Sequence, residues 1–495
     1  ELCGETDRHV VAIVGDGALT GGMTWEAINN IAEGKNRSVV IVVNDNARSY
    51  SPTIGGLANH LATLRTTQSY ERFLDWGKSV LGRTPLVGAP MYEALHGMKK
   101  GIKDFVAPQG MFEDLGLKYV GPVDGHNLED LEFALERARE FGGPVIVHAI
   151  TTKGRGYQPA ETDEADRFHA VGIVDPQTGQ PLKSSPESWT SIFSNSLVEI
   201  GNKRTDVVAI TAAMLGPTGL TAFSEAFPTR TFDVGIAEQH AVTSAVGMAH
   251  AGLHPVVAVY STFLNRAIDQ LIMDCALHKA GVTFVLDRAG ITGDDGASHN
   301  GMWDMSLLRV VPGLRLYAPR DGQHLGMALH ESVDIADAPT AIRFPKGAVG
   351  SAIDAIDNEN FGERIFGAPN SDVTIVSIGA LAKSAIEAAT QLQNNGLSVE
   401  VIDPIVAYPV SSELIDYLSN SHLVVTVEDG LVDGGVGQAI CAQMAEHGRP
   451  VNSLSIGIPK QFLTHKSRAS WLAELGLDGS GIASAISARL HSQVQ

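Results

Sequence analysis

Short apolar runs alternate with longer amphipathic stretches along almost the whole of this 495-residue chain. In the first 150 residues the apolar runs are HVVAIVG, VVIVVN and PVIVHAI, and an amphipathic segment covers residues 127–141. Alternation of this kind is typical of parallel strands joined by crossover helices. Because residues 10–14 are five apolar residues in succession, we expect this strand to be covered on both faces.

The same alternation occurs twice more. Predicted strands at DVVAITAAM, HPVVAVYS, VTFVLDRA, LRLYAP and TAIRFP lie between residues 189 and 345, and VTIVSIG, SVEVIDP and HLVVTVED follow residue 372. Residues 158–188 show no period and are predicted to be a linker, and another unpatterned stretch, residues 347–372, precedes the third block. Since the chain is too long for one core, we predict three α/β domains in series, at residues 1–187, 188–363 and 364–495. Residues 66–114 are expected to be an excursion over the active-site face or a mobile insertion.

Composition and charge argue against some classes of binding partner and indicate the cellular setting. A net charge of −20 and a pI near 5.2 argue against nucleic acid and anionic membranes, although not against an anionic substrate. The three cysteines, Cys3, Cys275 and Cys441, are far apart and form no C-x-x-C pair, which favours a reducing, cytoplasmic setting. No segment has the roughly 20 consecutive apolar residues of a membrane-spanning helix.

The start of the chain is unusual for a complete protein. ELCGETDRH is polar, lacks an initiator methionine and does not resemble a signal peptide. A buried strand so close to the start seldom opens a sheet alone. We therefore expect the chain to be a fragment whose true beginning lies upstream.

Two polar motifs follow neighbouring predicted strands. Gly15-Asp16-Gly17 comes directly after the first strand, and Asn44-Asp45-Asn46 follows the second, about thirty residues on. The carboxyl ends of parallel strands are where open α/β sheets bind ligands, although GDG alone also suits a simple tight turn. Magnesium prefers oxygen ligands that it shares with substrate phosphates. Asp16, Asn46 and a backbone carbonyl near Arg48 are therefore predicted to bind magnesium.

A glutamate in the middle block is the next candidate. In FDVGIAEQHAVT, Glu238 stands at the mouth of a strand and the start of an apolar helix. Taken alone, such a residue is a helix cap favoured by the helix dipole.

Longer motifs identify a family resemblance. GDG followed by NDN resembles the diphosphate-binding motif of thiamine-diphosphate enzymes. YSTFLNRAIDQ, DRAGITGDDGASHNG, GLKYVGPVDGHN and ITTKGRGY, at their spacing here, resemble the 1-deoxy-D-xylulose-5-phosphate synthase family, its actinobacterial members most closely, over essentially the whole chain. Transketolase and the E1 components of oxo-acid dehydrogenases share the architecture but are not expected to carry these strings together. The resemblance implies three doubly wound, transketolase-like α/β domains, the last of them a C-terminal-like domain.

The resemblance also implies thiamine diphosphate and Mg²⁺ as cofactors. It assigns Gly17 and Ala18 to the diphosphate and Tyr157 to the surroundings of the cofactor. Glu238 is implied to hydrogen-bond N1′ of the aminopyrimidine, which lets the cofactor act as its own base. The first domain is thereby expected to bind the diphosphate and the second the pyrimidine.

Further residues are implied to bind the substrates. The aromatic pair Tyr260 and Phe263 is implied to line the pyrimidine and substrate pocket, although core packing is the alternative for Phe263. Asp295 and His299 are implied to face the pyruvate-derived intermediate, and the alternative is that they form a turn. Three cations are implied to lie near the phosphate of glyceraldehyde 3-phosphate, with surface ion pairs as the alternative for each: Arg266, Arg288 and Lys346.

The implied reaction condenses pyruvate with D-glyceraldehyde 3-phosphate, releases carbon dioxide and gives 1-deoxy-D-xylulose 5-phosphate for isoprenoid, thiamine and pyridoxal synthesis. A homodimer is implied as well. The alternatives are a transketolase or oxo-acid dehydrogenase E1, and a cofactor-binding protein without catalysis.

Two further features of the sequence concern the completeness of the active site and the role of a glycine-rich turn. The GHQ and HSS motifs of the family do not occur here, so we expect low or no activity from this chain alone; His60, in LANHLAT, is expected on a helix near the diphosphate loop instead. The GGVGQA turn at residues 434–439 is predicted to be structural and dimer-forming.

Overall fold

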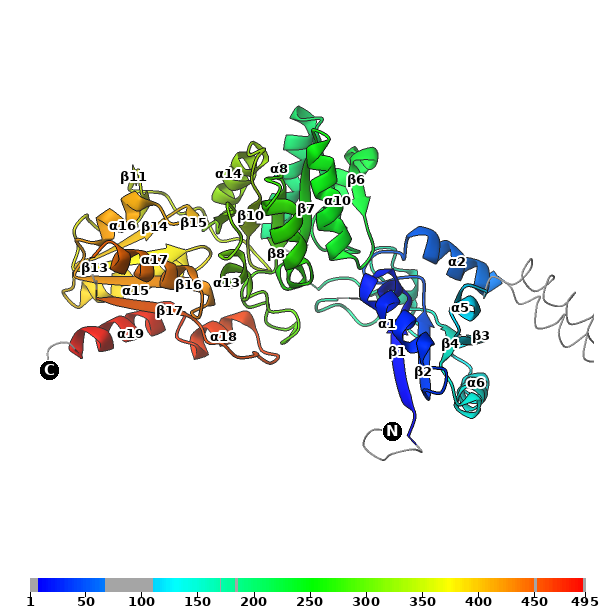
Figure 1. Cartoon of the computed structure of the whole chain (residues 1–495). Coiled ribbons are helices and arrows are strands. Elements are labelled where there is room, and N and C mark those ends of the chain that lie inside the picture. Colours follow the sequence, from blue (N-terminus) through cyan, green and yellow to red (C-terminus); the bar gives the residue numbers. More distant parts are fainter. Residues whose placement is uncertain (1–7, 67–109, 170, 183–185, 449–451, 493–495) are drawn as a thin grey trace, which may run out of the picture. The chain divides into compact units, whose positions relative to one another are not determined.

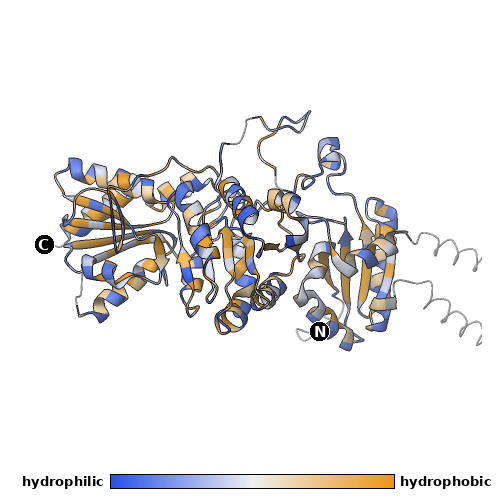
Figure 2. Cartoon of the chain, turned by 90° about the horizontal axis from the view of Figure 1, so that it is seen from above, coloured by the Kyte–Doolittle hydropathy of each residue, from blue (hydrophilic) through white to orange (hydrophobic). Residues whose placement is uncertain are grey.

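The computed structural model describes residues 8–66, 110–169, 171–182, 186–448 and 452–492. These residues form three mainly parallel sheets, whose strands are largely apolar (Figures 1 and 2). The chain divides into two compact units. The first unit is Glu1–Leu182 with Val234–Ala237, and the second unit is Lys183–Asp233 with Glu238–Gln495. Across the described ranges, no helix combines the length and apolar character that crossing a bilayer requires.

The sheet of the first unit is parallel, with the strand order β1-β2-β4-β3. Its strands are β1 Val10–Gly15, β2 Val39–Asp45, β3 Lys118–Asp124 and β4 Val145–Ile150. Its helical segments are η1 Asp16–Thr20, α1 Gly22–Glu33, α2 Gly55–Thr66, α5 Gly110–Asp114, α6 Leu128–Phe141 and α7 Gln158–Thr162. The strands predicted from the three apolar runs are confirmed.

Local sequence explains the helix α6, which was also predicted. The Asn127 side chain accepts hydrogen bonds from the backbone N–H groups of Glu129 (3.1 Å) and Asp130 (3.4 Å), and so caps the helix. The helix ends at Gly142, whose φ of 72° is the left-handed conformation that glycine adopts readily. His60 lies on the helix α2, as expected. The excursion predicted at residues 66–114 falls mainly on residues 67–109, which are outside the described residues, and α5 forms its end.

The expectation that β1 is covered on both faces is wrong. This strand lies at one edge of the described sheet, where β2 is its neighbour. The side chains of Val10, Val11 and Ile13 are 63%, 54% and 78% exposed. An unbroken apolar run does not distinguish a central strand from an edge strand, because the run reports only the apolar character of the strand and not its neighbours.

The second unit contains a seven-stranded sheet with the order β15-β9-β10-β8-β7-β5-β6, in which only β15 is antiparallel to its neighbour. Its strands are β5 Val207–Thr211, β6 Thr231–Asp233, β7 His254–Tyr260, β8 Thr283–Asp287, β9 Arg315–Tyr317, β10 Thr340–Arg343 and β15 Val406–Tyr408. The helical segments are α8 Trp189–Lys203, α9 Thr221–Ala226, η2 Pro228–Arg230, α10 Glu238–His250, α11 Ser261–Leu264, η3 Asn265–Ala267, α12 Ile268–Gln270, η4 Leu271–Ala276, α13 Asp304–Leu308 and α14 Gly322–Val333. All five strands predicted for this block are confirmed.

The second unit also contains a six-stranded sheet with the order β11-β12-β14-β13-β16-β17. Its strands are β11 Asp357–Glu359, β12 Gly362–Phe366, β13 Val373–Ile378, β14 Val399–Asp403, β16 Leu423–Leu431 and β17 Ser453–Ile458. The helices are α15 Ala382–Asn394, α16 Ser412–Leu418, α17 Val436–Glu446, α18 Arg468–Glu474 and α19 Gly479–His491. The three strands predicted here are confirmed.

Two short edge strands lie within residues 347–372, the stretch that shows no period in the sequence. β11 and β12 lie in that stretch and form an antiparallel hairpin at the edge of the third sheet. Their sequences, DNE and GERIF, are mostly polar and too short to show a period. β15, from the third block of the sequence, pairs with β9 of the second sheet. The three domain boundaries stay predictions.

The GGVGQA turn begins α17, and a side chain of the protein occupies the N-terminus of this helix. The buried Glu428 carboxylate accepts hydrogen bonds from the backbone N–H groups of Val436 (2.9 Å) and Gly437 (3.0 Å). Burial raises the pKa of Glu428 to about 7. Because an internal carboxylate already satisfies these N–H groups, the turn has a structural explanation and needs no bound phosphate.

Buried His254, at the start of β7, is expected to make the free energy of unfolding depend on pH. Its Nε2 lies 2.8 Å from Oγ1 of Thr283, and burial lowers its pKa from 6.5 to about 4. The lowered pKa favours the neutral ring in the folded state, so its contribution is present above pH 6.5 and is lost as the pH falls towards 4. We expect the free energy of unfolding to be about 2 kcal/mol lower at about pH 5 than at about pH 7.5 because of this residue.

Urea titration of three proteins at both pH values measures this effect. His254→Gln should remove about this much of the pH dependence, while the exposed His250→Gln, on α10, should retain it. Equal pH dependence in the native chain and His254→Gln would contradict the prediction.

Candidate active site

The glycine-aspartate-glycine loop follows β1 and opens η1. Asp16 is almost fully buried. Its Oδ1 accepts a hydrogen bond from the backbone N–H of Asn46 (3.3 Å), and its Oδ2 accepts one from the Thr53 hydroxyl. β1 and β2 are parallel neighbours in register from Val10 with Val39 to Gly15 with Asn44. This pairing brings together the ends of the two motifs, and with them Asp16 and Asn46.

The asparagine-aspartate-asparagine loop is held by its own side chains. Asn46 Oδ1 accepts a hydrogen bond from the backbone N–H of Arg48 (3.1 Å), and Asp45 Oδ1 accepts one from the N–H of Ala47 (3.2 Å). Ala47 adopts a left-handed conformation with φ of 64°. The Arg48 guanidinium donates to the carbonyls of Glu164 (2.9 Å) and Ala165. The loop is therefore a fixed turn that carries two of the predicted magnesium ligands.

These residues fit a magnesium ion shared with a diphosphate. A carboxylate, an amide oxygen and a backbone carbonyl are hard oxygen ligands of the kind that Mg²⁺ takes alongside phosphate oxygens and water. Over the ranges that the structure covers, no group of three or more His, Cys, Asp or Glu side chains could hold a metal ion. An ion at this loop would therefore depend on the mixed ligand set and on the phosphates.

Lys153 is a residue of this region to which the sequence analysis gave no role, although it stands in the quoted string ITTKGRGY. Its Nζ donates to the backbone carbonyl of Ser49 (2.7 Å) and lies 2.5 Å from Nδ1 of His169. Burial lowers its pKa, while the carboxylates of Asp166 and Asp16 act in the opposite direction. A cation near Asp16 would add to the positive field at a bound diphosphate.

Glycine at position 17 permits close packing at the loop. A Cβ atom there would lie 3.3 Å from Ile236 Cδ1 and 3.3 Å from Ser49 Cβ. The backbone N–H of Ile236 donates to Oγ1 of Thr20 (2.9 Å), so the segment Val234–Ala237 packs on the loop within the first unit. The carbonyl of the neighbouring Ala18 accepts a hydrogen bond from the Thr24 hydroxyl (2.8 Å).

Tyr157 lies at the start of α7, in the same unit. Its hydroxyl donates to the carbonyl of Pro176 (2.9 Å), and its ring lies 5.9 Å from that of Phe168. The structure thus ties Tyr157 to the segment that follows α7.

In the second unit, Glu238 is the first residue of α10. Its side chain is buried, and Oε2 forms an ion pair with Nη1 of Arg266 at 2.7 Å. Burial raises the pKa of Glu238, which Arg266 and a backbone hydrogen bond only partly oppose. A buried carboxyl group with a raised pKa can share its proton with a ring nitrogen more readily than an ordinary surface glutamate.

The remaining predicted residues of this unit form two groups of contacts. The rings of Tyr260 and Phe263 stack with centroids 5.6 Å apart, and the Phe263 ring lies 5.6 Å from that of His299, edge to face. The Arg288 guanidinium lies 4.0 Å from the centroid of the Tyr260 ring. In the second group, Lys346 pairs with both carboxylate oxygens of Asp295, at 2.9 and 2.7 Å.

The electrostatics of this cluster favour a neutral histidine. Burial lowers the pKa of His299. The charges of Arg288 and Lys346 lower this pKa further, whereas the carboxylate of Asp295 raises it. His299 Nδ1 lies 2.9 Å from the Ser298 hydroxyl. A neutral imidazole can accept a proton at neutral pH, which makes His299 suited to acid–base work.

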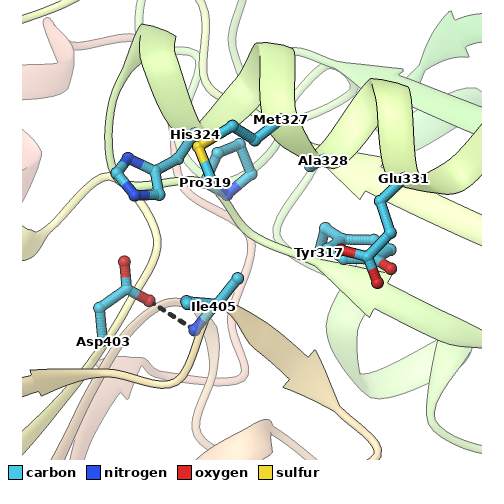
Figure 3. A pocket seen from close by; sticks show the side chains of 8 residues that line it. All are labelled: Tyr317, Pro319, His324, Met327, Ala328, Glu331, Asp403 and Ile405. Atoms are coloured by element: carbon cyan, nitrogen blue, oxygen red, sulfur yellow. Dashed lines mark hydrogen bonds between the residues drawn. The ribbon is translucent and has the colours of Figure 1, made fainter. Parts of the chain in front are cut away.

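A pocket elsewhere in the second unit contains none of the predicted residues (Figure 3). It lies beside α14, and its lining residues are Tyr317, Pro319, His324, Met327, Ala328, Glu331, Asp403 and Ile405. Its charged groups already have partners: His324 pairs with Asp321 (2.8 Å), Asp403 with Arg320 (2.7 Å) and Glu331 with Arg315 (2.9 Å). This pocket therefore offers no unpaired charge for a ligand.

Three family models match successive parts of the chain. The model of 1-deoxy-D-xylulose-5-phosphate synthase matches residues 1–151, that of the transketolase pyrimidine binding domain residues 185–351, and that of the transketolase C-terminal domain residues 364–482.

Curated relatives are similar over almost the whole chain. The 1-deoxy-D-xylulose-5-phosphate synthase 2 of Streptomyces coelicolor is 61% identical over 97% of this chain and 75% of its own length. That of Kitasatospora griseola is 59% identical over 100% of this chain and 79% of its own. The 1-deoxy-D-xylulose-5-phosphate synthase of Mycobacteroides abscessus is 56% identical over 98% of this chain and 76% of its own length.

Solved structures agree on the fold. One described as a split gene transketolase, inactive beta4 tetramer, has a TM-score of 0.54 and 26% identity, over 62% of this chain and 99% of its own. Transketolase from Campylobacter jejuni has a TM-score of 0.53 and 15% identity, over 98% of this chain and 78% of its own.

Proposed function

This chain belongs to the 1-deoxy-D-xylulose-5-phosphate synthase family, and we propose that it condenses pyruvate with D-glyceraldehyde 3-phosphate in a thiamine-diphosphate-dependent reaction that releases carbon dioxide. The observation that carries the proposal is the contact series from Arg288 through Tyr260 and Phe263 to His299, in a chain 61% identical to a synthase of this name. The product would be 1-deoxy-D-xylulose 5-phosphate, the first intermediate of the non-mevalonate route to isoprenoids. A cytoplasmic location and a homodimer complete the proposal.

In the proposed cofactor site, Asp16, the side chain of Asn46 and the carbonyl of Arg48 hold Mg²⁺. The adjacency of Asp16 and Asn46 supports this assignment. Gly17 and Ala18 lie against the diphosphate, and Tyr157 lies in the surroundings of the cofactor. Thiamine diphosphate, when bound, supplies the electron sink for the loss of carbon dioxide. Glu238 holds a proton at N1′ of the aminopyrimidine, a role that its burial and raised pKa support.

The roles proposed for the residues that contact the substrates are supported by their charge and burial. His299 moves a proton at a substrate oxygen, and Asp295 orients the same region through its pair with Lys346. The cations Arg288 and Lys346 bind the phosphate of glyceraldehyde 3-phosphate. Arg266 is proposed to contact this phosphate through the N–H groups that its pair with Glu238 leaves available.

The phosphate assignment gives a kinetic prediction. Lys346→Met is expected to lower kcat/KM for glyceraldehyde 3-phosphate about 10- to 100-fold, because a charge-assisted hydrogen bond contributes about 1.5–3 kcal/mol. KM for pyruvate should stay within about twofold of the native value, which steady-state kinetics with one substrate varied at a time would show. Lys383→Met, at an exposed lysine on α15, is the matched control. A loss confined to pyruvate would overturn the assignment.

Two alternative functions, a transketolase and a cofactor-binding protein without catalysis, can be distinguished from the synthase by substrate use and by cofactor binding. A transketolase would transfer a ketol unit from a sugar phosphate donor without consuming pyruvate. A binding protein without catalysis would take up thiamine diphosphate and magnesium, measured by calorimetry, and form no product. Pyruvate consumption that depends on both cofactors and on the aldehyde would support the synthase and exclude both alternatives.

A further inference from the structure

Three buried side chains on adjacent strands of the first sheet form a hydrogen-bonded series. They are Asp45 at the end of β2, His148 on β4 and Tyr119 on β3. His148 Nε2 lies 2.8 Å from Oδ2 of Asp45, and His148 Nδ1 lies 2.7 Å from the Tyr119 hydroxyl. All three residues are at least nine-tenths buried. None of the three is among the site residues predicted from the sequence.

One arrangement of hydrogens satisfies the whole series. If the Tyr119 hydroxyl donates to Nδ1 of His148, the Nε2–H of His148 can donate to the Asp45 carboxylate. Each group then has a partner of the opposite kind, which a buried polar series needs because an unsatisfied member costs free energy. In this arrangement the hydrogen bonds run from Tyr119 through His148 to Asp45.

The second oxygen of Asp45 connects the series to the loop. Oδ1 accepts a hydrogen bond from the backbone N–H of Ala47 (3.2 Å), which is in the left-handed conformation. A non-glycine residue in this conformation needs support from its surroundings. Asn46 and Arg48, two of the proposed magnesium ligands, flank Ala47. Asp45 thus fixes the turn from which both ligands project.

Aromatic packing holds the far end of the series. The ring of Phe112, on α5, stacks on that of Tyr119 with centroids 6.2 Å apart and planes 6° from parallel. The ring of His60, on α2, lies edge-on to Phe112 with centroids 6.3 Å apart. Residues of α5 and α2 therefore restrain the Tyr119 ring in the position in which its hydroxyl forms a hydrogen bond with His148.

We propose that His148 and Tyr119 are positioning residues for the magnesium–diphosphate loop, acting through Asp45 on the turn at Ala47. The inference rests on the proposed function, because it needs the loop to hold Mg²⁺ and a diphosphate. Neither residue is proposed to touch the ion or a substrate. Residues that orient metal ligands in this way typically change metal affinity about 10- to 100-fold when they are replaced.

Calorimetric titration of Mg²⁺ in the presence of thiamine diphosphate tests the proposal without an activity assay. His148→Phe should weaken Mg²⁺ binding about 10- to 100-fold. His148→Gln, whose amide can still donate to Asp45, should recover most of this loss. Tyr119→Phe, which keeps the packed ring, should weaken binding about threefold or more. Tyr317→Phe, at a buried tyrosine of the second unit, is the matched control and should leave the affinity unchanged.

The outcomes separate this inference from the proposed function. If Asp16→Asn abolishes Mg²⁺ binding while both His148→Phe and Tyr119→Phe bind like the native chain, the positioning role is wrong and the metal site stands. If Asp16→Asn binds Mg²⁺ normally, the metal site itself is wrong. Should His148→Phe fail to fold, the comparison of Tyr119→Phe with Tyr317→Phe still decides. Equal Mg²⁺ affinity in His148→Gln and a folded His148→Phe would also contradict the role of the hydrogen bond to Asp45.

Discussion

Glu238→Gln is expected to lower kcat by at least about 10³-fold while Mg²⁺ binding stays within about twofold of the native value. Glutamine keeps the shape of the side chain but cannot hold a proton for a ring nitrogen, the role proposed for Glu238. The side chain is buried at the start of α10, so water cannot readily substitute for the lost carboxyl group. Arg266 loses its ion-pair partner but is 36% exposed, so solvent can compensate its charge.

Single-turnover kinetics with calorimetry on the same preparation measures both effects. Glu225→Gln, at an exposed glutamate on α9, is the matched control and should behave as the native chain does. A Glu238→Gln protein that keeps more than about a tenth of native kcat would show that this carboxyl group is not catalytic.

Asp16→Asn is expected to weaken Mg²⁺ binding by at least about 100-fold, and with it the affinity for thiamine diphosphate. The substitution removes the carboxylate charge of the proposed site. It also places an N–H₂ group where the carboxylate accepts hydrogen bonds from Asn46 and Thr53, so the turn loses one of these contacts. Asp114→Asn, at an exposed aspartate on α5, is the matched control.

Calorimetric titration with Mg²⁺ at saturating thiamine diphosphate gives the dissociation constant directly. Unchanged affinity in Asp16→Asn would mean that the ion binds elsewhere. A loss shared equally by Asp114→Asn would point to a general loss of structure.

Much of the fold was predictable because apolar runs of five to eight residues bounded by turn residues identify buried strands. The runs correctly predicted β2, β4, β7 and β8, among others. Each of these strands lies between two other strands, and most of its apolar side chains are buried. β3 was not predicted as a strand, because glycine and proline interrupt GLKYVGPVDG and its register shifts between Val120 and Val123. β1 was predicted as a strand covered on both faces, and this covering is wrong for the described sheet, because strand order is a property of the whole sheet.

The candidate site was predictable where sequence position determines spatial position. Asp16 and Asn46 lie together because each follows one of two parallel, adjacent strands. The pair between Glu238 and Arg266 was not foreseen, because no pattern in the sequence places the start of α10 beside η3 and only the folded chain brings the two side chains together. The series of Asp45, His148 and Tyr119 was hidden for the same reason: histidine and tyrosine within strands look like ordinary core residues.

The isotopic composition of the product shows whether carbons 2 and 3 of pyruvate enter the sugar phosphate. The chain would be supplied with pyruvate labelled with ¹³C at carbons 2 and 3, unlabelled glyceraldehyde 3-phosphate, thiamine diphosphate and Mg²⁺, both alone and joined to the unmatched part of the Streptomyces coelicolor relative. We expect a five-carbon sugar phosphate carrying both labelled carbons, and none when Glu238 is replaced by glutamine. Pyruvate left intact by the joined protein, with no labelled sugar phosphate formed, would contradict the proposed condensation.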